Sequence, residues 1–175
     1  MISVIYMYQR SRQLPLRSNR VFQASLYLTL VGLLLDVAST LGIVYSGHLP
    51  AALPVLLCKT HVASLLLIVL TAFAYVFTSV MYHVPSYKRT IVAAAIIGAL
   101  MVSLIYLLPL TLHYDPISGK AWIEGPSTVV AYVGVFAGIV FNLIQLHRYR
   151  KHIYDRQFKI VIVWMCMWIV AALIQ

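Results

Sequence analysis

Long apolar runs divide this 175-residue chain, and its basic residues fall almost entirely on alternate sides of those runs. Of the 13 Lys and Arg residues, all but two precede the first run, follow the second or follow the fourth. These are Arg10, Arg12, Arg17, Arg20, Lys88, Arg89, Arg148, Arg150, Lys151, Arg156 and Lys159. Only Lys59 and Lys120 lie on the opposite sides. Because short loops rich in Lys and Arg stay in the cytoplasm, the pattern predicts a multi-pass protein of the cell membrane with a cytoplasmic N-terminus.

The length of the runs predicts their secondary structure. A membrane-spanning helix needs about 20 apolar residues to cross about 30 Å of hydrocarbon. Only helices and closed barrels satisfy the backbone there, and these runs are too continuous for the alternating strands of a barrel. We therefore predict an all-α bundle of five transmembrane helices with short loops. The predicted spans cover about 21–45, 55–82, 90–112, 127–146 and 158–175, after a basic cytoplasmic segment at 1–20.

Composition restricts the possible partners and cofactors. Only 10% of the residues are charged, whereas a soluble domain carries about a quarter. The net charge of +9 is concentrated beside the spans, so lipid headgroups are a simpler partner than nucleic acid. Two cysteines without a CxxC spacing and six histidines without a ligand spacing predict no metal site and no cofactor. No catalytic motif is present in the sequence, so enzymatic activity is left open.

The predicted orientation has a consequence for the C-terminal end. A fifth span would begin in the cytoplasm and finish on the outer side at Gln175, without flanking charges. We expect a longer protein in which a sixth helix returns the chain to the cytoplasm, because natural chain ends are usually polar and exposed. The alternative is a complete protein with an odd number of spans.

Asp36 is the one acidic residue within a predicted span. Such a group is costly in a bilayer and by default marks function or a specific partner. It belongs to a stripe of small and polar residues at spacings of three and four, which share one helix face. The stripe consists of Ser25, Thr29, Gly32, Asp36 and Ser39, with Thr40 beside Ser39. Because small and polar residues let membrane helices pack closely, this face should point into the bundle.

Depth in the bilayer predicts a partner for Asp36. At about 1.5 Å per residue, Asp36 lies about 22 Å from the cytoplasmic end of its helix, near the outer boundary. His61 enters from the outer side to a similar depth, and Lys59 is slightly shallower and able to snorkel out. We therefore predict an Asp36–His61 pair, with Lys59 as its rival. The pair is either a hydrogen bond that locks two helices or a polar site sensitive to protons or a ligand, and the first interpretation is favoured.

The fourth predicted span carries a second set of small and polar residues at helical spacing. Gly134 and Gly138 form a GxxxG motif, which permits close contact between helices, and Asn142 continues the same face. Because this motif is common by chance in apolar runs, we predict packing within the bundle rather than dimerisation.

Four local segments together resemble a known family. They are Leu14-Pro-Leu-Arg-Ser-Asn-Arg-Val-Phe, Leu35-Asp-Val-Ala-Ser-Thr, Gly125-Pro-Ser-Thr-Val-Val-Ala-Tyr and Ala171-Ala-Leu-Ile-Gln. The chain resembles the N-terminal membrane region of Firmicutes signalling proteins that carry a C-terminal GGDEF (diguanylate cyclase) domain. The resemblance implies a cytoplasmic domain beyond Gln175 that makes cyclic di-GMP from two GTP, and a homodimer formed through that output. No catalytic residue of that domain has a counterpart here.

The leading hypothesis is a membrane-embedded sensory module that regulates this output, with an unknown ligand. The alternative is a small transporter or channel-type protein without enzymatic output. A transport pathway should show polar residues through the whole bilayer depth, and one carboxylate with scattered hydroxyls falls short of that.

Overall fold

The computed structural model describes residues 17–80 and 87–148, together with Val163. Four long helices dominate this part of the chain: α2 (Arg17–Val44), α3 (Ala52–Val80), α4 (Tyr87–Leu107) and α5 (Pro126–Arg148). Each is long and apolar enough to cross a membrane. The predicted spans at 21–45, 55–82 and 127–146 agree with α2, α3 and α5. The predicted fifth span at 158–175 lies outside the described residues except for Val163.

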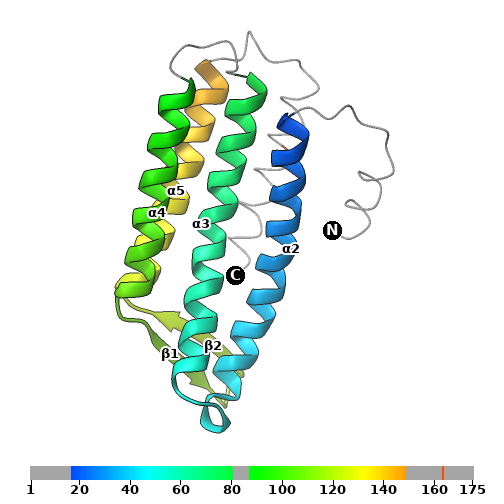
Figure 1. Cartoon of the computed structure of the whole chain (residues 1–175). Helices are drawn as coiled ribbons and strands as arrows, with labels where there is room; N and C mark the ends of the chain where they lie inside the picture. Colours follow the sequence, from blue (N-terminus) through cyan, green and yellow to red (C-terminus); the bar gives the residue numbers. More distant parts are fainter. Residues whose placement is uncertain (1–16, 81–86, 149–162, 164–175) are drawn as a thin grey trace, which may run out of the picture.

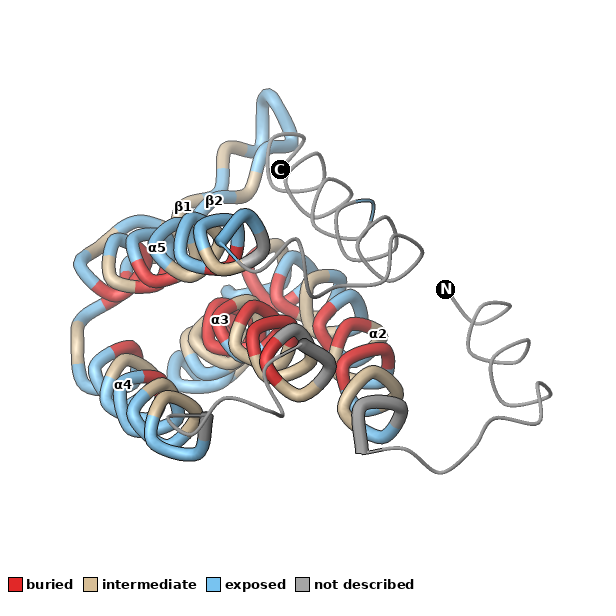
Figure 2. The backbone as a smooth tube through the Cα atoms, turned by 90° about the horizontal axis from the view of Figure 1, so that it is seen from above, coloured by how far each residue is buried: buried red, intermediate tan, exposed pale blue. Residues whose placement is uncertain are grey.

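The helices run side by side, with successive helices in opposite directions (Figure 1). Helix α3 contacts all three of the others, and it lies between α2 on one side and α4 with α5 on the other (Figure 2). The bundle therefore has two distinct ends. The basic end carries the start of α2, the start of α4 and the end of α5, with Arg20, Lys88, Arg89 and Arg148. The hairpin end carries the short helix η1 (Ser46–His48) and a pair of strands.

The described part of the chain is mostly helical, as predicted, but a pair of strands adds to the helices and shortens the helical span predicted at 90–112. Helix α4 ends at Leu107, and β1 (Thr111–Asp115) pairs antiparallel with β2 (Lys120–Glu124). The register places Thr111 opposite Glu124 and Asp115 opposite Lys120. Pro109 explains the early helix end, because proline lacks an N–H and disfavours helical backbone in the residue before it. The apolar run therefore extends beyond the end of α4, and hydropathy alone could not show where the helix ends.

The hairpin turn follows the local chemistry of its residues. Asp115 accepts hydrogen bonds from the Ser118 hydroxyl at 2.7 Å and from the Ile117 N–H at 2.9 Å. These two bonds, the one from Ser118 first, lower the pKa of Asp115. Gly119 takes a φ of 67°, which favours glycine, and donates its N–H to the Asp115 carbonyl at 2.8 Å. Asp, Ser and Gly are common turn residues, and here they form the turn that joins the two strands.

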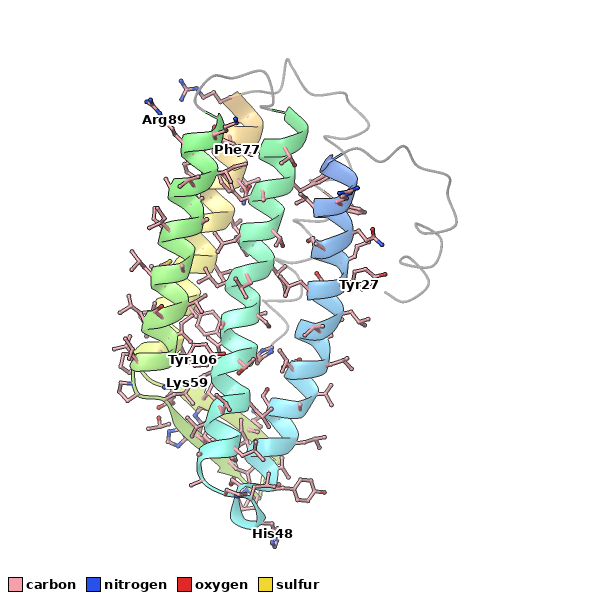
Figure 3. All side chains as sticks on the ribbon, viewed as in Figure 1. Tyr27, His48, Lys59, Phe77, Arg89 and Tyr106 are labelled. Atoms are coloured by element: carbon pink, nitrogen blue, oxygen red, sulfur yellow. The ribbon has the colours of Figure 1, made fainter. Side chains whose placement is uncertain are left out.

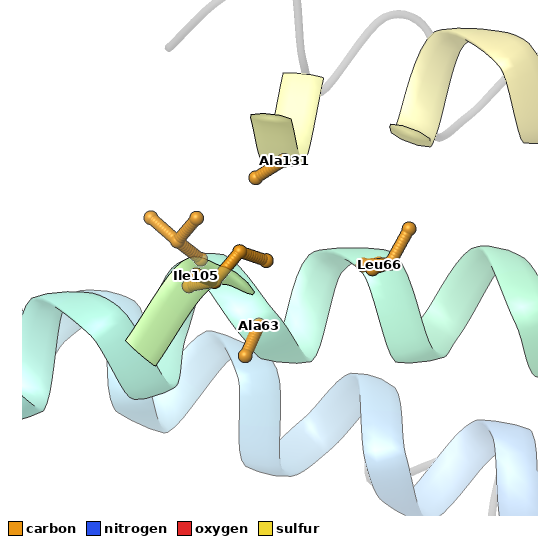
Figure 4. Close-up of a cluster of buried hydrophobic side chains, with 5 residues drawn as sticks. Ala63, Leu66, Ile105 and Ala131 are labelled. Carbon is orange, nitrogen blue, oxygen red and sulfur yellow. The ribbon is translucent and has the colours of Figure 1, made fainter. Parts of the chain in front are cut away.

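Buried apolar side chains extend along the bundle, from Ile43 and Ile105 near the hairpin end to Phe73 and Phe77 toward the basic end. One cluster joins α3, α4 and α5 through Val62, Ala63, Leu66, Ile105 and Ala131 (Figure 4). A second cluster joins Ile43 of α2 and Cys58 of α3 to Leu110, and the hairpin packs against it. Many large apolar side chains remain exposed on the outer faces of α2, α4 and α5. Such faces suit contact with lipid tails, which supports a membrane protein.

Candidate polar site between α2 and α3

The polar stripe of α2 faces α3, as predicted. Ser25, Thr29 and Ser39 are buried, and Gly32 lies against Ser64 and Ile68 of α3. A Cβ at Gly32 would meet the Ile68 Cδ1 at 3.1 Å and the Ser64 Oγ at 3.3 Å. The small residues of the stripe therefore allow a close approach of the two helices.

Asp36 and His61 meet across this contact. The Nε2 of His61 lies 3.5 Å from the Oδ1 of Asp36, with side-chain exposures of 10% and 37%. This separation is at the long edge of hydrogen bonding, and it becomes an ion pair when the imidazole is protonated. The His61 Nδ1 is buried and has no hydrogen-bond partner among the described residues. The site thus combines a half-accessible carboxylate with a buried imidazole that still has an unused nitrogen.

The two hydroxyl residues assigned to this site lie differently. Ser39 is buried, and its Oγ donates to the Asp36 carbonyl at 2.8 Å, so it supports the backbone beneath the carboxylate. Thr40 is exposed on the outer side of the same turn. The prediction that Thr40 belongs to the interior site is therefore wrong, because adjacent helical residues point about 100° apart.

Lys59 reaches a different part of the bundle from the one predicted. Its Nζ donates to the carbonyls of Tyr106 and Leu108, each at 2.7 Å. The last carbonyls of a helix have no partner within that helix, and a cation there also suits the helix dipole. Lys59 is thus a cap for the end of α4, and Figure 3 shows it beside Tyr106. No sequence pattern indicates this contact, which joins residues 47 and 49 positions apart.

Other polar groups strengthen this capped end of α4. The Ser127 hydroxyl is fully buried and donates to the Ile105 carbonyl at 2.9 Å. The Tyr106 hydroxyl donates to the Thr60 Oγ1 at 3.1 Å. These bonds hold the hairpin end of α4 to α3 and α5.

The glycines of α5 serve packing inside the bundle, as predicted for the GxxxG motif. A Cβ at Gly134 would meet Leu66 and Met101, each at 3.0 Å, and one at Gly138 would meet the Val69 Cγ1 at 2.6 Å. Asn142 is buried and donates from Nδ2 to the Gly138 carbonyl at 3.0 Å. Its Oδ1 finds no partner within the described part of the chain.

Metal-ligating side chains do not converge in the described helices and hairpin. Within 17–80 and 87–148, no group of three or more His, Cys, Asp or Glu residues could hold a metal ion. On the exposed hairpin, His113 stacks on Trp122 with ring centroids 5.3 Å apart, and its Nε2 lies 3.6 Å from a Glu124 carboxylate oxygen. His113 on the hairpin and His61 on α3 therefore contact different residues and do not form one site.

Comparison with known proteins gives no relative for this arrangement. No protein-family model, curated protein or solved structure matches the chain.

Proposed function

We propose that this chain is a membrane-embedded input module of a bacterial signalling protein, in which the Asp36–His61 contact sets the packing of α2 against α3. The observation that carries the proposal is this contact at 3.5 Å between two ionisable side chains on different transmembrane helices. Ionisable groups are rare in spans because they are costly there, so a pair of them on facing helices is unlike ordinary packing.

The Asp36–His61 pair would make two packing states of the bundle differ in the strength of the attraction between α2 and α3. Its attraction is strong when Asp36 is charged and His61 is protonated, and weak when either charge is lost. The Asp36 carboxylate is only partly buried, with 37% of its side chain exposed, so it is not enclosed by the contact with His61. A signal that binds one state better than the other shifts the population toward that state. The altered packing of α2 against α3 would then extend along the two helices toward the basic end.

The nature of the output rests on the resemblance to GGDEF-linked membrane regions. Under this proposal the basic end faces the cytoplasm, as Arg20, Lys88, Arg89 and Arg148 favour. A sixth helix would return the chain to that side, and a diguanylate cyclase domain after it would work there as a homodimer.

The hydroxyl groups at the α2–α3 contact argue against the alternative of a proton or ion pathway. Thr29 donates to the Ser25 carbonyl, Ser64 to the His61 carbonyl, and Thr71 to the Ile68 carbonyl. Each bond closes on the donor's own helix, as is usual for Ser and Thr in helices. The longer contact of 3.4 Å between the Thr71 and Ser25 hydroxyls is one link across the helices, and one link does not form a relay.

The test uses the protein made from its native gene in membranes. Its mass shows whether a domain follows residue 175, and cyclic di-GMP formation from GTP measures the output. We expect Asp36→Asn and His61→Gln to change that output several-fold, and the matched control Thr40→Val, on the exposed side of the same turn, to leave it unchanged.

Two results would overturn parts of the proposal separately. Absence of cyclic di-GMP synthesis in the wild-type protein would remove the GGDEF output. Synthesis that is equal in the wild-type protein, Asp36→Asn and Thr40→Val would show that the pair is not the switch.

A further inference from the structure

A half-open apolar cavity of about 360 Å³ lies between α3, α4 and α5. Its walls include Val69 and Phe73 from α3, Ala94 and Ile97 from α4, and Ala137 and Phe141 from α5. It is separate from the Asp36–His61 site between α2 and α3, because α2 lies on the other side of α3 from α4 and α5 (Figure 2). The inference below therefore does not depend on the proposed function.

The cavity occupies the half of the bundle nearer the basic end. Along α4 it extends from Thr90 to Met101, which is about 16 Å at about 1.5 Å per residue. Toward the hairpin end it is closed by the core cluster around Ile105, Leu66 and Ala131. Toward the basic end it reaches within one helical turn of Lys88 and Arg89.

The rim at the basic end is positively charged. Lys88 and Arg89 at the start of α4 are exposed, as are His147 and Arg148 at the end of α5. Both helix ends lie at the same end of the bundle (Figure 1), and Arg89 projects beyond the start of α4 (Figure 3). Lys and Arg at the membrane surface attract anionic headgroups, and phosphate oxygens accept strong hydrogen bonds from them.

We propose that the cavity binds an acyl chain of an anionic phospholipid from the leaflet at the basic end, with the phosphate held by this rim. The walls are apolar and the rim is cationic, which is the chemistry of such a lipid. At roughly 30 Å³ per group, the share of a water molecule in the liquid, 360 Å³ holds about a dozen methylene-sized groups.

A helix is about 10–12 Å across with its side chains, so only one face of it would lie against the opening, whereas a chain of methylene groups can occupy the interior. An acyl chain is slender enough to enter between α4 and α5 from the bilayer. The volume also falls within the ~300–1,000 Å³ typical of small-molecule pockets.

The test uses the whole protein in vesicles that contain either phosphatidylglycerol or phosphatidylcholine with a photoactivatable acyl chain. Cross-linked peptides are then mapped by mass spectrometry. We expect the wild-type protein to be labelled on 90–101 and 134–141, at least fivefold more by the anionic lipid. Ala94→Leu, which fills the cavity, should reduce this labelling at least fivefold.

Matched variants separate the cavity and the rim. Ala95→Leu places the same side chain on the neighbouring exposed position, outside the cavity, and should keep full labelling. Ala137→Leu fills the cavity from α5 and gives a second test if Ala94→Leu does not fold. Lys88→Gln with Arg89→Gln should bring phosphatidylglycerol down to the level of phosphatidylcholine, whereas Lys120→Gln at the hairpin end should not.

Three results would contradict the inference. Equal labelling of the two filling variants and the wild-type protein would exclude the cavity as the binding site. Equal labelling by both lipids would remove the role of the rim. Absence of lipid labels, with a cysteine at position 94 cross-linking to a second copy or to residues 158–175, would show that protein fills the cavity.

Discussion

Helix α3 packs against α2 on one side and against α4 and α5 on the other, and the two contacts use different residues. The side toward α2 is lined by buried polar residues and one pair of ionisable groups, Asp36 and His61. The side toward α4 and α5 has hydrogen-bonding groups at the hairpin end and apolar walls around a cavity toward the basic end. Both sides use glycine for close approach. What differs is the partner of the charged group: Asp36 and His61 face each other across the α2 side, whereas Lys59 binds backbone carbonyls on the α4 side.

We therefore assign the α4 and α5 side to the stability of the fold and the α2 side to the response to a signal. On the α4 and α5 side, Lys59 and Ser127 satisfy the last carbonyls of α4, so their bonds fix a helix end. On the α2 side, hydroxyls mainly satisfy their own helices, and Asp36 and His61 are left to interact across the contact. The α2–α3 contact also buries Ser25, Thr29 and Ser39, so loss of the Asp36–His61 interaction would change a packed contact without removing it.

The largest expected effect comes from breaking the cap of α4. Lys59→Met removes two charge-assisted hydrogen bonds and leaves helix-end carbonyls unsatisfied. We expect a loss of about 2 kcal/mol in the free energy of unfolding, because charged hydrogen bonds contribute about 1.5–3 kcal/mol. Lys120→Met, on the exposed hairpin, is the control and should stay within about 0.5 kcal/mol of the wild-type protein. Unfolding in bicelles measures both, and equal losses for the two variants would contradict the assignment of Lys59 as a cap.

A smaller effect should distinguish the two glycine contacts. Alanine at Gly138 would approach the Val69 Cγ1 to 2.6 Å, and valine is stiff in a helix, so the neighbour cannot easily turn away. Overpacking of about 1–3 kcal/mol exceeds the roughly 1 kcal/mol that alanine gains over glycine, so Gly138→Ala should lose about 1 kcal/mol.

Gly32→Ala is the matched variant on the α2 side. Its Cβ meets the flexible end of Ile68 at 3.1 Å, which can yield by a few tenths of an ångström. We therefore expect Gly32→Ala to be neutral or slightly stabilising in the same unfolding assay. If Gly32→Ala proved the more damaging of the two, the α2 contact would be the tighter one.

The smallest effect concerns the exposed hairpin turn. Ser118→Ala removes the main hydrogen bond that lowers the pKa of Asp115, so that pKa should rise toward its ordinary value. A carboxylate with a lowered pKa stabilises the folded turn above the unfolded pKa of about 3.9, and this contribution is lost as the pH falls through the folded value. Carboxyl NMR titration measures the shift. An unchanged pKa in Ser118→Ala would exclude this bond as its cause, and Ser103→Ala, on an exposed face of α4, is the control.

Much of the fold follows from patterns that one sequence contains. Apolar length predicted the helices, because a bilayer demands about 20 apolar residues whatever the neighbours are. The spacing of Ser25, Thr29, Gly32 and Ser39 predicted the buried face of α2, because 3.6 residues per turn places them together. The Asp36–His61 contact followed from depth, since both residues lie at a similar distance from the same end.

The remaining features depend on contacts between distant segments. The end of α4 at Leu107 depends on Pro109, and the last carbonyls of α4 are satisfied by Lys59 and Ser127, which no local pattern joins. The β-hairpin lies in an apolar run that also suits a helix, so hydropathy could not separate the two. The prediction that Thr40 lies on the buried face was wrong, because its neighbour Ser39 is at the edge of that face. The fifth span stays a prediction.

The most direct test of the central claim is a double-mutant cycle on Asp36 and His61, measured as the free energy of unfolding in bicelles. If the two side chains interact across α2 and α3, Asp36→Asn, His61→Gln and the double variant should give a coupling free energy of about 1 kcal/mol, within the range of about 0.6–1.7 kcal/mol for polar pairs in membranes. Single effects that add within about 0.3 kcal/mol would contradict the account, because the pair would then contribute nothing to the contact between the helices.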